Sequence, residues 1–312
     1  MAESKTAVMA ALFGNAALAV MKGVAAASTG SAAMLAETFH SVADTGNQAL
    51  LFLGMRLSER PPDRIHGFGH GKDVYFWAFV VSVMLFSLGG AFSIWEGMHK
   101  LRGGGEHGGS AWWSYAVLAA GFGFESVSLY VALRALRKAM GKKSLGGYWR
   151  DNRDPTLPTV VLEDTAALVS LGAAATGIWL SQVTGSSVWD AGASAVIGLL
   201  LVGVAVVLAL ENYSLLIGEA APATVEAKIR RLVREDEDVV DVIDLRTMHM
   251  GPEDILVALG VAFRPSLTTA QIEAAVVRLQ NAIRKALDGA TNSSLILIEP
   301  TRPGAKQGDR AA

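Results

Sequence analysis

The sequence predicts a polytopic α-helical membrane protein with six transmembrane helices, followed by a small cytoplasmic α+β domain. Three observations support this fold class. Of the 312 residues, 51% are hydrophobic and only 18% are charged, and the mean hydropathy is positive. Six separate apolar segments are each near or above the ~20 residues needed to cross a bilayer. After Ile217 the composition changes abruptly to a charged, mixed pattern, which marks a second domain.

The apolar segments occupy the first 217 residues. Gly, Ala and Ser are frequent in them, which suits close packing of helix backbones in lipid. The opening MAESKTAVMAALFG has no basic stretch before its apolar run, so we interpret it as the start of a membrane helix rather than a cleaved signal. The predicted spans are residues 6–27, 33–57, 74–101, 112–136, 159–183 and 188–217.

Positive charge in the connecting segments predicts the orientation. The links after the first and fifth spans carry no charge, whereas the links after the second and fourth spans are rich in Lys and Arg. By the positive-inside rule these basic links are cytoplasmic, and so are both termini. The Ala/Gly-rich composition and the lack of a transit-peptide pattern favour a bacterial inner membrane. The basic residues are Arg56, Arg60, Arg64 and Lys72 in one link, and Arg134, Arg137, Lys138, Lys142, Lys143, Arg150 and Arg153 in the other.

The C-terminal part alternates between helix and strand patterns. Residues 222–235 and 268–287 have helical apolar periodicity, with a capping signal at Thr269 and Glu273, and residues 239–248, 255–263 and 294–298 are typical of strands. The order α-β-β-α-β predicts a small α+β sandwich. We therefore expect a membrane domain over residues 1–217, a cytoplasmic domain over 218–300 and a disordered tail over 301–312.

Several classes of function are excluded or disfavoured. The sequence contains no P-loop, G-x-S-x-G or H-E-x-x-H motif, so no enzymatic activity is expected. A net charge of -2 and the lack of a basic stretch interleaved with aromatic residues give no indication of a nucleic-acid partner. Cysteine is absent, so a metal would have to be bound by His, carboxylate, amide or carbonyl groups.

The second span carries polar residues in its first half. His40, Asp44 and Asn47 are spaced i, i+4, i+7, which places them on one stripe of a helix. Ionisable groups in a membrane-length apolar segment are costly, so they should face a cavity or a bound cation rather than lipid. An imidazole and a carboxylate one turn apart supply half of a site for a divalent transition metal. The alternative is a buried His–Asp hydrogen bond that only ties two helices together.

The fifth span contains the adjacent carboxylates Glu163 and Asp164. Two anionic groups there would repel each other unless one is protonated or a cation lies between them. Together with His40 and Asp44 they provide one nitrogen and three carboxylates, enough for a four-coordinate divalent ion near mid-membrane. Glu125, in the fourth span, could relay protons or pair with a neighbouring helix.

Four stretches, FHSVADTGNQ, HGFGHGK, VIDLRTMHMG and LILIEP, together with this architecture, resemble the cation diffusion facilitator (cation efflux) family. FHSVADTGNQALLFLG and VVLEDTAAL are most similar to the branch that contains the animal mitochondrial zinc exporter. The resemblance implies a homodimer in the lipid bilayer that exchanges a divalent metal, usually Zn²⁺, for protons. It implies no cofactor beyond the transported metal.

One departure from the family pattern concerns the metal. Most zinc-transporting members have His-x-x-x-Asp in the fifth helix, whereas this chain has Val160 before Asp164. The implied site is His40, Asp44 and Asp164, completed by Glu163, Asn47 or water. Because such a site is rich in oxygen ligands, Mn²⁺, Co²⁺ and Fe²⁺ remain possible substrates in addition to Zn²⁺. A non-transporting membrane scaffold or metal sensor with a degraded site is the alternative from another class.

Two further stretches bear on metal binding. Asp63, His66 and His70 match a secondary loop site of some family members, with a metal-entry or dimer-stabilising role; alternatively, the histidines only shape a Gly-rich turn. In the C-terminal domain the family's histidine positions hold Ile243, Leu259 and Leu297, so we expect a dimerisation module without its metals.

Overall fold

In the computed structural model the chain divides into two compact units, and the structure describes residues 2–102, 111–141, 144, 146, 156–252, 254–287 and 295–301. The helical unit comprises Met1–Leu57, Asp73–Trp149 and Asp154–Tyr213, and the second unit comprises Ser58–Lys72, Arg150–Arg153 and Ser214–Ala312. The link 58–72 thus groups with the C-terminal unit. The tail predicted to be disordered lies outside the described residues except for Thr301, which ends a strand.

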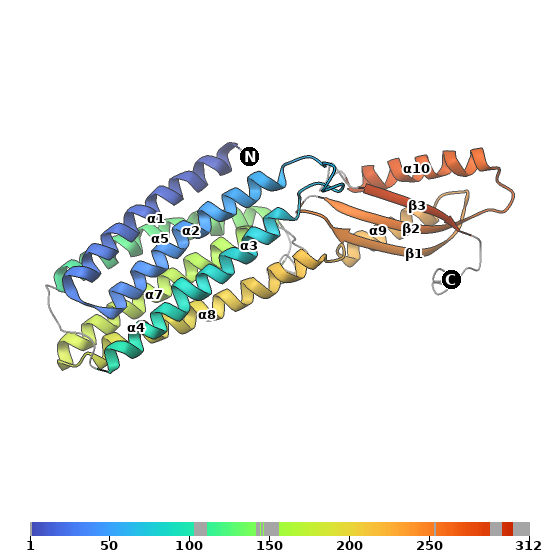
Figure 1. Cartoon of the computed structure of the whole chain (residues 1–312). Coiled ribbons are helices and arrows are strands. Elements are labelled where there is room, and N and C mark those ends of the chain that lie inside the picture. Colours follow the sequence, from blue (N-terminus) through green and yellow to red (C-terminus); the bar gives the residue numbers. More distant parts are fainter. Residues whose placement is uncertain are drawn as a thin grey trace. The chain divides into compact units, whose positions relative to one another are not determined.

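Each predicted span corresponds to a helix of the helical unit (Figure 1). Among the described residues, five helices are long and apolar enough to cross a membrane. The second helix is not one of them, because its polar residues lower its hydropathy. The third span changes hydrogen-bonding pattern along its length. The helices are α1 (Ala2–Thr29), α2 (Ala32–Ser58), α3 (Asp73–Met84), the π-helical η1 (Leu85–Ala91), α4 (Phe92–Leu101), α5 (Ala111–Met140), α7 (Thr156–Thr184) and α8 (Val188–Ile217).

Small residues set how closely these helices pack. A Cβ atom added at Gly198 of α8 would lie 2.7 Å from the carbonyl oxygen of Gly90 in η1, and one added at Gly97 of α4 would lie 2.6 Å from that of Ala191. Glycine therefore permits the close approach of α8 to the third span, as is common in membrane helix pairs. The shared core of the unit is built largely from alanine and leucine, including Ala25, Ala33, Ala43, Ala174, Leu171 and Leu201.

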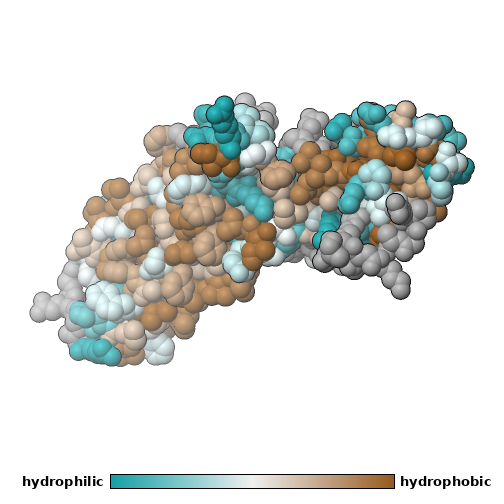
Figure 2. Space-filling model, turned by 45° about the vertical axis from the view of Figure 1, so that its right-hand side comes forward, coloured by the Kyte–Doolittle hydropathy of each residue, from teal (hydrophilic) through white to brown (hydrophobic). Residues whose placement is uncertain are grey.

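Large apolar side chains are also exposed on the outside of the helical unit. Figure 2 shows them spread over the face in view. A water-soluble protein rarely exposes so extensive an apolar surface, whereas lipid is the solvent that such a surface suits. The exposed residues include Val20, Val24, Phe122, Val127, Val131, Leu199 and Leu210.

The C-terminal unit contains a three-stranded sheet in the order β1-β2-β3. Strand β2 pairs antiparallel with β1 and parallel with β3, and α10 forms the crossover between the parallel strands. Apolar faces of both helices pack on the sheet, with Ile229, Val257, Leu279 and Ile283 fully or almost fully buried. The elements are α9 (Ala223–Arg234), β1 (Val239–His249), β2 (Ile255–Phe263), α10 (Thr269–Leu287) and β3 (Leu295–Thr301).

The start of α10 differs from the predicted capping signal at Thr269 and Glu273. The cap is Thr268, whose backbone N–H and hydroxyl both donate to Oε1 of Gln271, at 2.8 and 2.9 Å. The prediction was therefore one residue late for the threonine. A glutamine at the third helical position closes a capping box as well as a glutamate does.

Candidate metal centre

Helix α2 presents His40, Asp44 and Asn47 to the interior of the helical unit, with exposed fractions of 1%, 6% and 0%. Nε2 of His40 lies 3.0 Å from Oδ2 of Asp44, one helical turn away. Among the described residues, Nδ1 of His40, Oδ1 of Asp44 and Oδ1 of Asn47 have no hydrogen-bonding partner. Buried polar atoms normally have partners, so three unpartnered ligand atoms on one stripe fit a bound cation.

Helix α7 contributes the two adjacent carboxylates, each anchored by a different neighbour. Nδ2 of Asn47 donates to Oε1 of Glu163 at 2.8 Å, which ties α2 to α7. The hydroxyl of Ser128, on α5, donates to Oδ2 of Asp164 at 2.8 Å. Both carboxylates are 6% exposed. Both carboxylates thus lie in the interior, and Asn47 is a hydrogen-bond donor that orients Glu163.

Glu125 joins the same buried group from α5. It is 3% exposed and lies one turn before Ser128, on the side of α5 that faces Asp164. Asp44 and Asp164 are buried in the same helical unit. With Glu163, four carboxylates thus share one buried region, and such a group is stable only with protons or a cation among them.

The membrane residues do not all converge in this structure. Among the described residues, three donor atoms from different His or acidic side chains lie within 4.8 Å of one another only at Asp63, His66 and His70. The helical-unit residues instead form the His40–Asp44 pair and the carboxylates on α7. The predicted four-ligand site His40, Asp44, Asp164 and Glu163, with Asn47, therefore stays a prediction whose members lie in one buried region.

A second buried ionic group adjoins this stripe, and sequence reasoning missed it. Nζ of Lys22 on α1 donates to Oε2 of Glu37 and to the hydroxyl of Ser41 on α2, both at 2.8 Å. Lys22 and Glu37 are fully buried. The signal was present in the sequence: a lone lysine lies within the first apolar segment, and an acid precedes His40 by three residues.

The loop residues Asp63, His66 and His70 converge, which the sequence alone left open. Oδ1 of Asp63 lies 3.4 Å from Nδ1 of His66, and Oδ2 lies 3.1 Å from Nε2 of His70. The backbone N–H groups of His66 and Ile65 also donate to Oδ1. These N–H groups, foremost that of His66, together with His70, hold the pKa of Asp63 well below its ordinary value. The cluster is largely exposed, so it offers ligands without the low dielectric of an interior.

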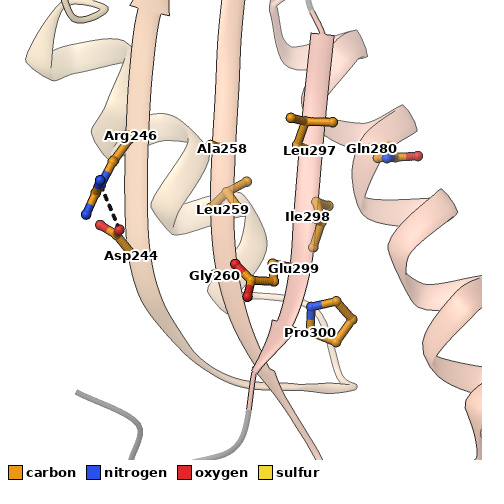
Figure 3. A pocket seen from close by; sticks show the side chains of 10 residues that line it. All are labelled: Asp244, Arg246, Ala258, Leu259, Gly260, Gln280, Leu297, Ile298, Glu299 and Pro300. Atoms are coloured by element: carbon orange, nitrogen blue, oxygen red, sulfur yellow. Dashed lines mark hydrogen bonds and ion pairs between the residues drawn. The ribbon is translucent and has the colours of Figure 1, made fainter. Parts of the chain in front are cut away.

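The C-terminal unit offers no comparable donor set at the positions that the family uses. A pocket of ≈ 660 Å³ lies at the sheet, and Figure 3 shows Leu259 and Leu297 on its neighbouring strands, with an Arg246–Asp244 ion pair at one side. Ile243 is half-buried on β1. His249 is buried at the end of β1. The ten residues that line the pocket include no histidine.

The sequence of the helical unit is similar to that of a known protein family. A family model described as the cation efflux transmembrane domain matches residues 8–217. The proton-coupled zinc antiporter SLC30A9, mitochondrial, of Xenopus laevis is 32% identical over 243 residues, which are 77% of this chain and 43% of the relative. Metal tolerance protein C4 of Arabidopsis thaliana is 32% identical over 231 residues, or 70% and 48% of the two chains. This chain thus spans less than half the length of these two relatives.

Magnetosome proteins are more distant relatives. MamM of Magnetospirillum gryphiswaldense is 24% identical over 282 residues, or 85% of this chain and 79% of the relative. A solved nickel form of a MamM CTD variant matches with a TM-score of 0.23 and 21% identity, over 26% of this chain and all of that one. The apolar helices and the match over residues 8–217 together identify a multi-pass membrane protein, and the chain belongs to the cation efflux family.

Proposed function

We propose that this protein is a homodimeric, proton-coupled exporter of divalent transition-metal cations, with Zn²⁺ as the first candidate. The observation that carries the proposal is the α2 stripe: three buried ligand atoms, Nδ1 of His40, Oδ1 of Asp44 and Oδ1 of Asn47, lack hydrogen-bonding partners among the described residues. They lie in the same interior as Glu163 and Asp164. An apolar helix that retains such groups needs a cation to compensate them.

The chemistry of the ligands supplies the coupling. A metal that enters from the cytoplasm binds His40, Asp44 and Asp164, with Glu163 or Asn47 completing the shell. Imidazole and carboxylate bind metal only when deprotonated, so protons and metal compete for the same atoms. Protonation on the far side of the membrane then weakens the site and releases the ion. No separate proton relay is required for the exchange.

The proposed topology follows from the charges of the connecting segments. Six helices over residues 1–217 cross a bacterial inner membrane, with both termini in the cytoplasm. Residues 218–300 form the cytoplasmic dimerisation domain. The loop group Asp63, His66 and His70 is a metal-entry or dimer-stabilising site. The name of the Xenopus laevis relative, a proton-coupled zinc antiporter, supports the exchange of Zn²⁺ for protons.

A second candidate substrate is Mn²⁺, Co²⁺ or Fe²⁺. It is favoured by Val160, one turn before Asp164, because the site then contains one nitrogen ligand and several oxygens. A non-transporting scaffold or metal sensor would retain the same residues without moving an ion.

Purified protein reconstituted into liposomes tests these candidates. We expect metal uptake accompanied by opposite proton movement, both saturable and both driven by a pH gradient. A competition series with Zn²⁺, Mn²⁺, Co²⁺ and Fe²⁺ ranks the substrates. Metal binding without metal-dependent proton flux would identify a scaffold or sensor, and absence of binding in the helical unit would refute the proposed site.

A further inference from the structure

Lys22 forms the most deeply buried ion pair in the described part of the helical unit. Its ammonium lies 2.8 Å from Oε2 of Glu37 and 2.8 Å from the hydroxyl of Ser41, and both charged side chains have no exposed surface. A lysine in a membrane helix usually extends its charge to the interface. Lys22 instead keeps its charge in the interior, which requires a reason beyond helix packing.

Glu37 lies on the same stripe of α2 as the proposed ligands. It precedes His40 by three residues and Asp44 by seven, so Glu37 and Asp44 point in nearly the same direction, about 10 Å apart along the helix axis. Its Oε1 is buried and does not hydrogen-bond to Lys22, and Ser170 of α7 lies beside the carboxylate. Without Lys22, Glu37 would be one more carboxylate ligand beside His40.

The stem of Lys22 is confined from the α5 side. A Cβ atom added at Gly121 would lie 3.5 Å from Cε of Lys22 and 3.4 Å from Cδ2 of Leu171, so the α5 backbone and α7 close over the lysine. Ser41 accepts the other hydrogen bond from the ammonium. The positive charge is therefore held at one place next to the stripe rather than free to move to solvent.

We propose that Lys22 is a tethered cation that occupies the Glu37 end of the α2 stripe, confines the cargo ion to His40 and Asp44, and sets the affinity of that site. This inference rests on the proposed function, because it takes His40 and Asp44 as cargo ligands. Lys22 and Glu37 are positioning residues. The ammonium repels a divalent ion and neutralises one carboxylate, and Glu37 in turn screens the ammonium from the cargo.

A second buried pair in the same unit provides a matched control. Nζ of Lys100 lies 2.8 Å from Oδ2 of Asp190, with both side chains about as well buried. Asp190 also accepts from the hydroxyl of Ser31 and the backbone N–H of Ala32, at 2.6 and 2.8 Å. Lys100, on α4, also donates to the carbonyl oxygen of Gly30, so the pair fastens the α1–α2 turn to α4 and α8. No proposed cargo ligand belongs to this group.

The test measures equilibrium Zn²⁺ binding to the full-length protein by calorimetry, in a background in which Asp63, His66 and His70 are alanine. Lys22→Met should bind Zn²⁺ about tenfold or more tightly than the background, and Glu37→Gln about tenfold or more weakly, because each changes one charge beside the site. The double variant Lys22→Met/Glu37→Gln should return to within about threefold, since the two charges cancel. Lys100→Met should lower thermal stability but leave the Zn²⁺ affinity within about threefold.

A merely structural role predicts a different pattern. Both single variants would then lose stability and weaken Zn²⁺ binding together, and that result would overturn the inference. Unchanged affinity in Lys22→Met would do the same. If Lys22→Met cannot be recovered folded, Glu37→Gln carries the test, because its amide retains hydrogen bonding to Lys22 and only the negative charge is lost; unchanged affinity there also refutes the inference. A background that binds no Zn²⁺ refutes the proposed function and the inference with it.

Discussion

The two candidate metal sites of this chain have opposite strengths. On α2 and α7 the donors are buried and partly unpartnered, but in this structure they do not all converge. In the loop, Asp63, His66 and His70 bring three donor atoms within 4.8 Å of one another, but Asp63 and His66 are about half exposed. The ligands on α2 and α7 are thus buried but not all close together, whereas the loop ligands are close together but largely exposed.

This difference bears on which site can couple binding to movement. A buried charge that loses its partner costs several kcal/mol, so the donors on α2 are strongly driven to hold a cation or protons. Exposed ligands are solvated by water whether or not a metal is present, and their interactions are screened by salt. We therefore expect the interior residues to determine transport and the loop to modulate it. The predictions below test this contrast, from the largest expected effect on transport to the smallest.

Removal of an interior carboxylate should have the largest effect. Asp44→Ala and Asp164→Ala should each reduce metal transport at least about 100-fold, because each leaves the cargo ion without a charged ligand in a low-dielectric site. Transport is measured in proteoliposomes, and size-exclusion chromatography checks that expression and dimerisation stay near normal. Wild-type rates in either variant would mean that the proposed site is wrong.

Glu163 should contribute less than Asp44 or Asp164, because its Oε1 already accepts a hydrogen bond from Asn47. Glu163→Gln keeps the shape and an amide oxygen but loses the charge, so Zn²⁺ affinity should fall about tenfold, and Glu163→Ala should be worse. Affinity and transport are measured from about pH 6 to 8. Normal affinity with a lost pH dependence would identify Glu163 as a proton carrier; no change in either would leave three protein ligands.

Val160→His should shift selectivity rather than abolish transport. Val160 is half-buried on α7, one helical turn before Asp164, where an imidazole would add a nitrogen ligand. Nitrogen ligands favour Zn²⁺ over Mn²⁺, so the Zn²⁺/Mn²⁺ transport ratio should rise about threefold to tenfold. The ratio is measured by metal competition in liposomes. An unchanged ratio would show that this position does not face the cargo.

Replacement of the loop residues should have the smallest effect. With Asp63, His66 and His70 all changed to alanine, transport near pH 7.5 should stay within about twofold of wild type, because exposed sites contribute little binding energy. A larger loss would place the loop on the obligatory path of the ion and invert the contrast between the two sites.

The loop should nevertheless bind metal with a definite pH dependence. The N–H groups that donate to Asp63 lower its pKa. Its carboxylate is therefore charged at every pH above about 4, the pKa of an unfolded Asp, and stays charged at a lower pH than that. Imidazole binds metal only when deprotonated, so Zn²⁺ affinity should fall at least about tenfold when the pH is lowered from about 7.5 to 5.5. Calorimetry on Asp44→Ala/Asp164→Ala isolates this site; a constant affinity would contradict the assignment.

The sequence by itself determined the elements and the stripes within them. The predicted bounds of the sixth span and of the strand 255–263 coincide with α8 and β2. The placement of His40, Asp44 and Asn47 on one buried stripe also followed from the sequence, because the helical repeat is a local property of the backbone. The sequence supplied Asp63, His66 and His70 within eight residues of chain but left open whether they converge, because a loop has no fixed repeat.

Only the tertiary structure decided which of these stripes meet. Lys22 pairs with Glu37 across 15 positions of sequence, Ser128 with Asp164 across 36, and Asn47 with Glu163 across 116. The pattern of one helix fixes which face is polar but not which neighbour lies opposite, because helix neighbours are selected by long-range packing of small residues such as Gly90 and Gly198. A buried charge makes a partner necessary, and packing selects that partner.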